Sequence, residues 1–501
     1  MEYHRKNYAQ AISLYLDQAA GGDGSAYNSL RFAASGALRN RSTSLKPLAS
    51  DPRVQPVITA YIISGGWSDD PVDVDGAVRE PVVRLLEKQT FVSAPAGGWH
   101  KMDSPARLWL EAVEAAKVRD VVSAEKLALA AYQCGEFAVA ARWIDRAPDL
   151  PTSQWLKSKL LLREGKVDQA AVLLAKLVRQ FPVGRVETNE SATTLQQRLA
   201  IVENSQDTPA SAQVLGELGA LRVARREYTE ALDALLRSGY TQDAAYVADR
   251  VMTLEELKGY VDRCWSEAPQ GEAEELGNLR NFIRSLLGQR LVRVGQYFVA
   301  RNYFQPRELE FLDLYVNSIT VGRDETRPHA ERANALWRGA QVVFEDRFVI
   351  HAPVETDWNL RSGNFSYTDA PPARIQSMTN ALLPVSVDEQ QRVARTSTFP
   401  DRNWHYRFMA ANMAWEAAQL MPDNSDETAR VLWQGGTWIK YADPKAADVF
   451  YKALVRRCRN TALGTAADRR RWFPSLDENG NILPFKPRDG KALTDAAVTE
   501  E

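Results

Sequence analysis

Residues 287–304 read LGQRLVRVGQYFVARNYF, and this stretch contains the pattern that decides the fold. Gly295 is followed by Tyr297, then by Ala300 and, four positions later, by Phe304. Residues four positions apart are neighbours on a helix surface, so Ala300 and Phe304 face the same way on a helix. A glycine just before such a helix is typical of a tight turn between two helices. The stretch therefore predicts two helices joined at Gly295.

The same spacing recurs upstream. Three further copies are Gly135, Phe137, Ala140 and Ile144; Gly165, Val167, Ala170 and Leu174, with Pro182 closing the unit; and Arg226, Tyr228, Ala231 and Leu235. The alanines at 140, 170, 231 and 300 lie 30, 61 and 69 residues apart, close to one, two and two unit lengths. We therefore expect a degenerate unit in each longer gap, and residues 243–252 with 254–265 are a candidate. An all-α chain of helical hairpins is predicted.

These residues resemble the tetratricopeptide repeat, a helix–turn–helix unit of about 34 residues. The matching positions are Gly288, Gly295, Tyr297, Ala300 and Phe304, the copy from Gly165 to Pro182, and Gly435, Ala447 and Tyr451 near the C-terminus. The resemblance implies an α-solenoid of degenerate hairpins whose concave surface binds an extended peptide or a protein partner. Residues 423–430 through 456–458 more weakly resemble large uncharacterised exported bacterial repeat proteins, which implies an envelope setting and no known activity.

The repeat pattern and the breaks between its copies divide the chain. We expect N-terminal helical repeats at 1–65, a Gly/Pro/Asp-rich connection at 66–103, the main repeat array at 104–320, a helix and an irregular insert at 321–403, C-terminal helical repeats at 404–465 and a turn-rich tail at 466–501. The irregular insert, near 344–400, contains a candidate short strand at 348–350. Ser425 is a predicted N-cap of a helix over 426–440, and Pro444 suits the first turn of the next helix.

Composition excludes several classes of function. The 62 basic and 64 acidic residues give a net charge of −2, without the basic excess of a nucleic-acid-binding protein. No apolar run is long enough to span a membrane. The three cysteines share no zinc-binding spacing, and no dinucleotide, P-loop or serine-hydrolase motif occurs. We expect no cofactor, no metal and no catalytic residue.

Aromatic residues gather around the insert and supply the candidate binding residues. They are Trp358, Phe365, Tyr367, Trp404 and Tyr406. Exposed rings of this kind line grooves for peptides, carbohydrates or lipids, whereas buried rings would simply pack the insert onto the helices. A second hypothesis is a hydrolase-like site at His351, Glu355 and Asp357, with His405 nearby, because a histidine and two carboxylates bind zinc or transfer protons.

The sequence therefore favours a non-enzymatic scaffold or adaptor that binds a protein or peptide partner, as a subunit of a larger bacterial envelope assembly. A carbohydrate- or lipid-binding module and a hydrolase-like enzyme are the alternatives. The repeat pattern is already running at Tyr3, so we expect the chain to start within a helix whose upstream part is missing. On this expectation the location is periplasmic or envelope-associated, with the cytoplasm as the alternative.

Overall fold

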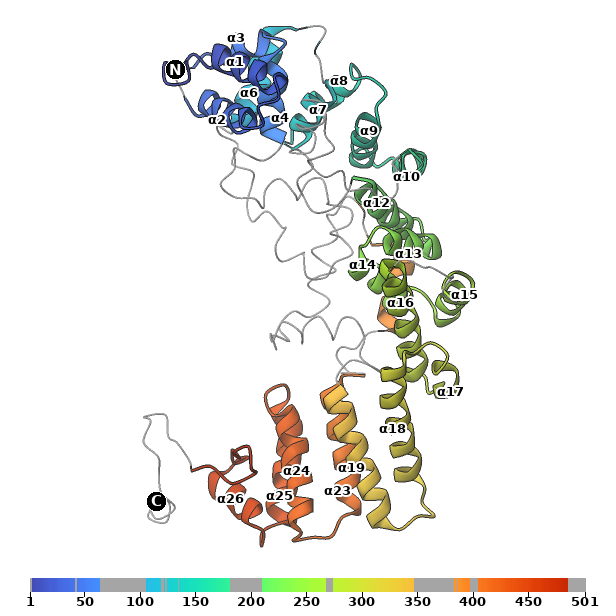
Figure 1. Cartoon of the computed structure of the whole chain (residues 1–501). Helices are drawn as coiled ribbons and strands as arrows, with labels where there is room; N and C mark the ends of the chain where they lie inside the picture. The colour runs from blue at the N-terminus through green and yellow to red at the C-terminus, as the bar shows by residue number, and fades with distance from the viewer. Residues whose placement is uncertain are drawn as a thin grey trace. The chain divides into compact units, whose positions relative to one another are not determined.

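The computed structural model confirms an all-α chain in the part that it describes (Figure 1). The described residues are 2–40, 43–63, 105–118, 121, 124–133, 135–180, 210–266, 274–346, 383, 385–396 and 404–484. Within these ranges there is no β-strand, and Leu476 and Ile482 form an isolated β-bridge. Most of the predicted short-β insert near 344–400 lies outside the described residues. No helix in the described part combines the length and apolarity needed to cross a membrane.

The chain divides into two compact units. Unit 1 comprises Met1–Val247 and Pro372–Gln390, and unit 2 comprises Ala248–Pro371 and Gln391–Glu501. The boundary falls within two elements: the π-helix η3 (Val247–Val251) and the helix α22 (Val387–Arg395).

The helices of unit 1 pack mainly against their neighbours in sequence. They are α1 (Tyr8–Ala20), α2 (Ala26–Arg39), α3 (Leu45–Ser50), α4 (Val54–Ile63), α6 (Pro105–Ala116), α7 (Ala124–Gln133), α8 (Phe137–Ile144), α9 (Pro151–Arg163), α10 (Val167–Val178), α12 (Ala210–Ala224), α13 (Tyr228–Arg237) and α14 (Thr241–Tyr246). The first helix begins at Tyr8 and not at Tyr3 as the sequence suggested, because residues 3–6 form a turn in which Lys6 has a φ of 61°.

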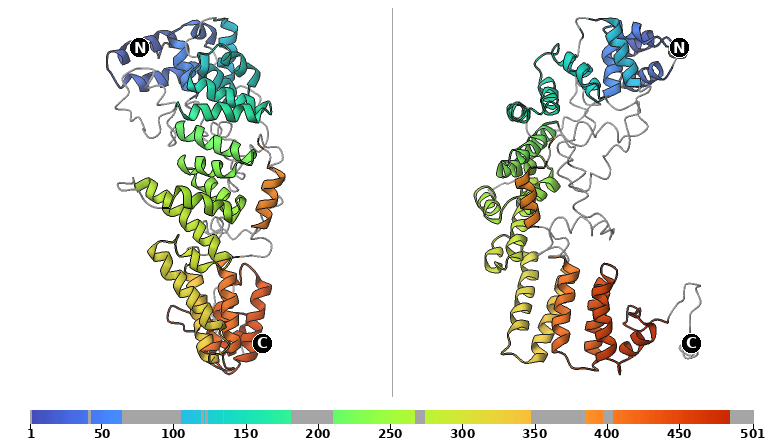
Figure 2. Two further views of the ribbon diagram at one scale, coloured as in Figure 1. Left: turned by 90° about the vertical axis from the view of Figure 1, so that its right-hand side faces the viewer. Right: turned by 180° about the vertical axis from the view of Figure 1, so that it is seen from behind.

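The helices of unit 2 include the longest ones of the described chain. They are α15 (Leu254–Cys264), α16 (Glu274–Arg293), α17 (Tyr297–Ala300), α18 (Pro306–Arg323), α19 (His329–Asp346), α23 (Tyr406–Leu420), α24 (Asp426–Ile439), α25 (Pro444–Arg457) and α26 (Ala462–Arg470). Helices α18, α19, α23, α24 and α25 pack side by side in that order, as the right-hand view of Figure 2 shows.

Local signals place the C-terminal helices where the sequence predicted them. The Ser425 hydroxyl accepts a hydrogen bond from the Glu427 amide at 3.2 Å and so caps α24. Pro444 occupies the first turn of α25, and the Asp443 carboxylate accepts from the amides of Lys445 and Ala446. These side chains satisfy amides that the first turn of a helix leaves without a backbone partner.

Five helix–helix turns share one backbone geometry, and four of them are the predicted copies. The left-handed residues are Gly135, Gly165, Arg226, Gly239 and Gly295, with φ between 65° and 79°. In each turn the amide of this residue donates to the carbonyl three positions earlier, and the next amide donates to the carbonyl five positions earlier. This is the Schellman arrangement, which favours glycine because a side chain disfavours positive φ. The turn at Gly239 joins α13 to α14 and lies in the gap between the third and fourth copies.

The alanine five positions after each turn residue is where the paired helices meet. Ala140, Ala170, Ala231, Ala244 and Ala300 are all fully buried. In the copy at 287–304 the preceding helix α16 also makes a close contact, because Gly288 on α16 lies against the ring of Phe304. Small residues at these positions let two helices approach closely, and the large residue fills the space between them.

Replacing Gly288 with alanine is expected to lower the free energy of unfolding by about 1–3 kcal/mol, because the added methyl overpacks the contact. The new carbon would lie 2.6 Å from Cε1 of Phe304. Gly259, which is exposed within α15 and has nothing within 4 Å of such a carbon, is the matched control. Gly259→Ala is expected to raise stability by about 0.5–1 kcal/mol. Urea unfolding measures both, and equal effects would contradict the packing role of Gly288.

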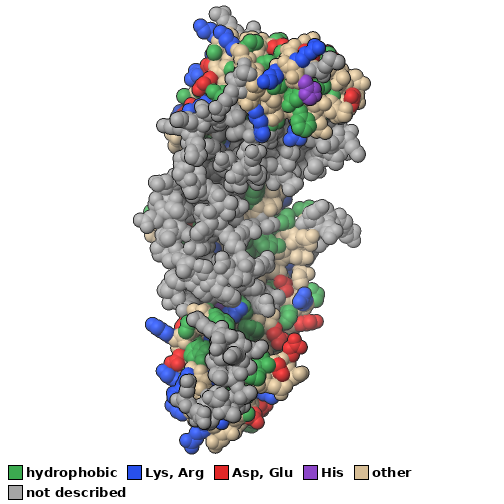
Figure 3. Space-filling model, turned by 90° about the vertical axis from the view of Figure 1, so that its left-hand side faces the viewer, with side chains coloured by type: hydrophobic (Ala, Val, Ile, Leu, Met, Phe, Trp, Pro, Cys, Tyr) green, Lys and Arg blue, Asp and Glu red, His purple; other side chains and the backbone are tan. Residues whose placement is uncertain are grey.

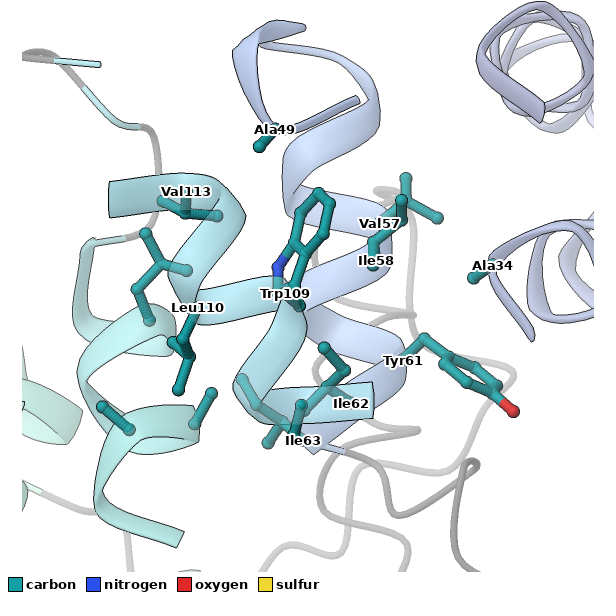
Figure 4. Packing of buried hydrophobic residues seen from close by; sticks show 14 of the residues in the cluster. Ala34, Ala49, Val57, Ile58, Tyr61, Ile62, Ile63, Trp109, Leu110 and Val113 are labelled. Atoms are coloured by element: carbon teal, nitrogen blue, oxygen red, sulfur yellow. The ribbon is translucent and has the colours of Figure 1, made fainter. Parts of the chain in front are cut away.

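A tryptophan organises the core between α4 and α6 (Figure 4). Trp109 is completely buried and packs among apolar residues of both helices, including Ile58 and Val113. Its indole Nε1 donates a hydrogen bond of 3.0 Å to Oγ1 of Thr59, so the ring is buried without losing its polar partner. This contact joins helices from the predicted segments 1–65 and 104–320.

The helix α22 corrects one expectation. Residues 344–400 were expected to be irregular, but Val387–Arg395 is helical. The Ser386 hydroxyl accepts from the Glu389 amide at 3.1 Å, Asp388 and Glu389 stand in the first turn, and Arg392 and Arg395 stand in the last. This distribution of charge suits the helix dipole, which stabilises a short helix of low apolarity.

Candidate protein-binding groove

A shortened second helix makes the copy at 287–304 different from the others. Helix α17 has four residues, whereas its counterparts α8, α10 and α13 have 8, 12 and 10. Pro306 keeps this helix from extending past Phe304, because the residue before a proline avoids the helical region; α17 itself ends earlier, at Ala300. Gln305 is accordingly extended, with ψ of 161°, and it caps the new helix α18 together with Glu308. The chain therefore leaves the hairpin early and turns into α18.

The early departure leaves a groove between α17 and α18 with a volume of about 490 Å³. Its walls include Tyr297, Phe298 and Val299 on one side and Leu312, Asp313 and Val316 on the other. All of these residues belong to unit 2. The volume lies within the range of ordinary ligand pockets, which are concave and mostly apolar.

Phe298 stands at this groove with 84% of its surface exposed. Val294, just before the turn, is 57% exposed, and Leu314 on α18 is 44% exposed. Single exposed apolar residues are common on protein surfaces, but an exposed aromatic ring beside an apolar hollow is a typical anchor for a partner. Burying such a ring contributes about 1.5–3 kcal/mol.

The two charged residues that line the groove are paired with each other, and the lining residue Tyr297 contacts a tyrosine on α18. The guanidinium of Arg301 forms an ion pair with the Asp313 carboxylate. The rings of Tyr297 and Tyr315 meet edge to face with their centroids 6.1 Å apart. Burial raises the pKa of Tyr315, so this phenol stays neutral at physiological pH. The groove thus offers apolar surface with its charges already balanced, which suits an uncharged apolar ligand.

Two members of the predicted aromatic set lie in the described residues, Trp404 and Tyr406, both in unit 2; Trp404 is half-buried and Tyr406 is buried. Tyr406 is 3% exposed, its ring centroid is 5.7 Å from that of Phe344, and its hydroxyl accepts a hydrogen bond from Arg407 at 2.9 Å. His405 is also buried; its Nδ1 accepts from the Arg407 amide at 3.3 Å and caps α23. These two residues serve the packing and the start of α23.

The other predicted site residues lie outside the described residues. They are Trp358, Phe365 and Tyr367 of the aromatic set, and His351, Glu355 and Asp357 of the hydrolase-like alternative. Both predictions therefore stay predictions. In the described ranges no group of three or more His, Cys, Asp and Glu side chains is placed to hold a metal ion.

Trp404 adjoins a buried charge cluster that the sequence did not reveal. The guanidinium of Arg293 lies 5.8 Å from the Trp404 ring centroid and donates to the fully buried Asp249 at 2.5 Å. Arg290, also buried, donates to the backbone carbonyls of Ala248 and Met252 at 2.6 and 2.9 Å. Ala248 lies within the π-helix η3 and Met252 directly follows it, so the Arg290 side chain is bonded to this turn of the chain.

Burial alone would raise the pKa of Asp249, but the guanidinium groups of Arg293, Arg290 and Arg250 outweigh it and hold the pKa below its ordinary value. The cluster combines one carboxylate with three guanidinium groups whose donors are engaged with protein oxygens. We therefore assign it a structural role at η3.

Sequence reasoning missed the groove, although the signal was present. Pro306 follows Tyr297 by nine positions, so the second helix of this copy has to end by Phe304 and a new helix can begin at the proline. The exposed Phe298 follows the signature aromatic directly, at a position that the repeat pattern leaves outside the helix interface. Comparison of the chain with protein-family models, with curated proteins and with solved structures gives no match.

Proposed function

We propose that the chain is a non-enzymatic scaffold of tetratricopeptide-like helical hairpins that binds an apolar segment of a protein partner in the groove between α17 and α18. The observation that supports this most directly is the 84% exposure of Phe298 beside a hollow of about 490 Å³. The five matching Schellman turns support the repeat character. The resemblance of the C-terminal residues to exported bacterial repeat proteins supports an envelope setting.

The mixed and nearly balanced charge of the chain supports the proposal that it recognises its partner through apolar contacts. Basic and acidic side chains both occur on the described surface in the view of Figure 3. With a net charge of −2, the chain has no general attraction for a strongly charged partner. The preferred ligand is therefore a short peptide segment that inserts aliphatic or aromatic side chains beside Phe298.

Replacing Phe298 with aspartate is expected to weaken peptide binding by roughly 10- to 100-fold, because the ring's burial energy is lost. The probe is a displayed library of random peptides selected against the intact chain, followed by affinity measurements on the enriched sequences. Enriched peptides should carry apolar residues and should lose affinity for the Phe298→Asp chain.

Phe32 on α2 provides a matched control, because it is also an exposed phenylalanine, at 68%, and belongs to unit 1. Phe32→Asp should leave the affinities of the selected peptides unchanged. Equal affinity for both variants, or a selection that enriches nothing over the Phe298→Asp chain, would contradict the proposed groove.

A further inference from the structure

The segment at residues 391–396 is held on unit 2 by polar contacts. These residues are the C-terminal half of α22 and the threonine after it, and none of them is buried. Arg392 makes a two-fold contact with the Glu256 carboxylate, with nitrogen–oxygen distances of 2.7 and 3.3 Å. It also reaches the Val251 carbonyl at 3.4 Å. An attachment made of exposed and half-buried polar groups depends strongly on charge and salt.

The end of the helix is recognised by a separate arginine. The guanidinium of Arg250, itself 3% exposed, donates to the carbonyl of Thr396 and, at 3.5 Å, to that of Val393. The Thr396 hydroxyl donates in return to the Arg250 carbonyl at 3.0 Å. The last carbonyls of a helix lack partners within the helix and carry its negative dipole end, so a buried guanidinium is a suitable receptor for them.

The two contacts define one site in unit 2, the helix-end site, made of Arg250, Val251 and Glu256. Arg250 donates hydrogen bonds to the last carbonyls of a helix, and Glu256 pairs with an arginine one turn before the end of that helix. Glu256 is fixed in place because its carboxylate also accepts from the Thr253 amide at 2.8 Å, which caps α15. The receptor is therefore preorganised on rigid elements, and its occupant is held by the polar contacts given above, with no side chain of its own buried.

Within unit 1, the first half of α22 is held in the same polar manner. The Tyr228 hydroxyl donates to Asp388 at 2.6 Å, and the Tyr246 hydroxyl donates to Glu389 at 2.9 Å. The apolar Val387 remains 65% exposed, and Glu389 is the buried residue of this helix. The helix thus carries no apolar face packed into a core.

We propose that residues 391–396 are an intramolecular ligand of the helix-end site, and that this site binds the C-terminal end of a partner helix carrying an arginine one turn before that end. The chain's own segment blocks the site until it is displaced. This proposal is independent of the groove between α17 and α18, because it rests on other residues and predicts another ligand.

The test uses a fluorescent peptide with the sequence of residues 385–396, added to full-length chains and followed by anisotropy. The wild-type chain should bind it weakly, because its own segment occupies the site. The Arg392→Glu chain, whose segment is repelled by Glu256, should bind the wild-type peptide at least tenfold more tightly. The Glu256→Arg chain should prefer a peptide carrying Arg392→Glu over the wild-type peptide.

Glu255, the exposed neighbour of Glu256, supplies the control, and Glu255→Arg should bind both peptides as the wild type does. Two results would overturn the proposal: equally weak peptide binding to every chain, or a Glu256→Arg chain that binds the Arg392→Glu peptide no more tightly than the wild-type peptide. A measurement without variants covers the case of a misfolded chain. Amide hydrogen exchange in residues 391–396 of the wild type should accelerate as ionic strength rises from about 0.05 to 0.5 M, while α16 stays protected. Unchanged exchange in residues 391–396 would equally overturn it.

Discussion

Replacing Lys159 with methionine is expected to lower the free energy of unfolding by about 3–5 kcal/mol, because it leaves the buried Glu217 carboxylate without its ion-pair partner. Lys159 on α9 is 2% exposed and forms an ion pair with Glu217 on α12, whose side chain is completely buried. The Trp155 indole donates to the other carboxylate oxygen of Glu217 at 3.0 Å. Removing the ammonium group leaves one hydrogen bond from Trp155 to offset the desolvation of a full charge.

The pH dependence distinguishes this cause from a simple loss of packing. Burial raises the pKa of Glu217 above its ordinary value, and the ammonium of Lys159 offsets part of that rise. Without Lys159 the folded-state pKa rises further, so the folded chain binds a proton more readily than the unfolded chain. Stability of the variant should then fall as pH rises above about 4.3, the ordinary glutamate pKa. Its deficit against the wild type should be larger at pH 7 than at pH 4.5.

Lys157 is the control on the same helix, because it is exposed two positions away. Lys157→Met should change stability by less than about 0.5 kcal/mol. The double variant Lys159→Met with Glu217→Leu should recover most of the lost stability, since well-packed apolar residues replace buried ion pairs at little cost. Urea unfolding of the four chains tests this, and a double variant as unstable as Lys159→Met would show that the charge is not the cause.

The turns were the most predictable part of the fold. A left-handed residue, a buried alanine five positions later and a large apolar residue after that are local demands of one helix–helix turn, so they leave a visible spacing. The turn at Gly239 escaped because Thr241 stands at the aromatic position of the signature and Ala248 at the large apolar one. The backbone hydrogen bonds are nevertheless those of the other four turns.

The groove and the buried charges were less accessible to sequence reasoning, for different reasons. Pro306 carries a local signal for the start of α18, but no local rule sets how α18 lies beside α17, and the groove depends on that arrangement. The pairing of Lys159 with Glu217 joins residues 58 positions apart, and a charged residue in a helix reads as solvent-exposed until its partner is known. Long-range pairing is the information that one sequence lacks.

The second large effect is expected at Asp249, which stands in the π-helix η3 and is fully buried. Asp249→Asn keeps the shape of the side chain but removes its charge, leaving the guanidinium groups of Arg293, Arg290 and Arg250 without a counter-charge from it. Stability should fall by about 3–5 kcal/mol, the usual result of breaking a buried ion pair on one side. Asp468→Asn on α26, where the aspartate is exposed, should change it by less than about 0.5 kcal/mol.

Acid should reveal the contribution of this carboxylate in the wild type. The guanidinium groups hold the pKa of Asp249 below its ordinary value despite its burial, so the folded chain binds this proton less readily than the unfolded chain. The stability from the carboxylate is therefore fully present above about pH 3.9 and is lost as pH falls toward the folded-state pKa. The difference in free energy of unfolding between the wild type and Asp249→Asn should become smaller in that pH range. A stability difference that stays constant down to pH 3 would mean that Asp249 acts through its hydrogen bonds and not through its charge.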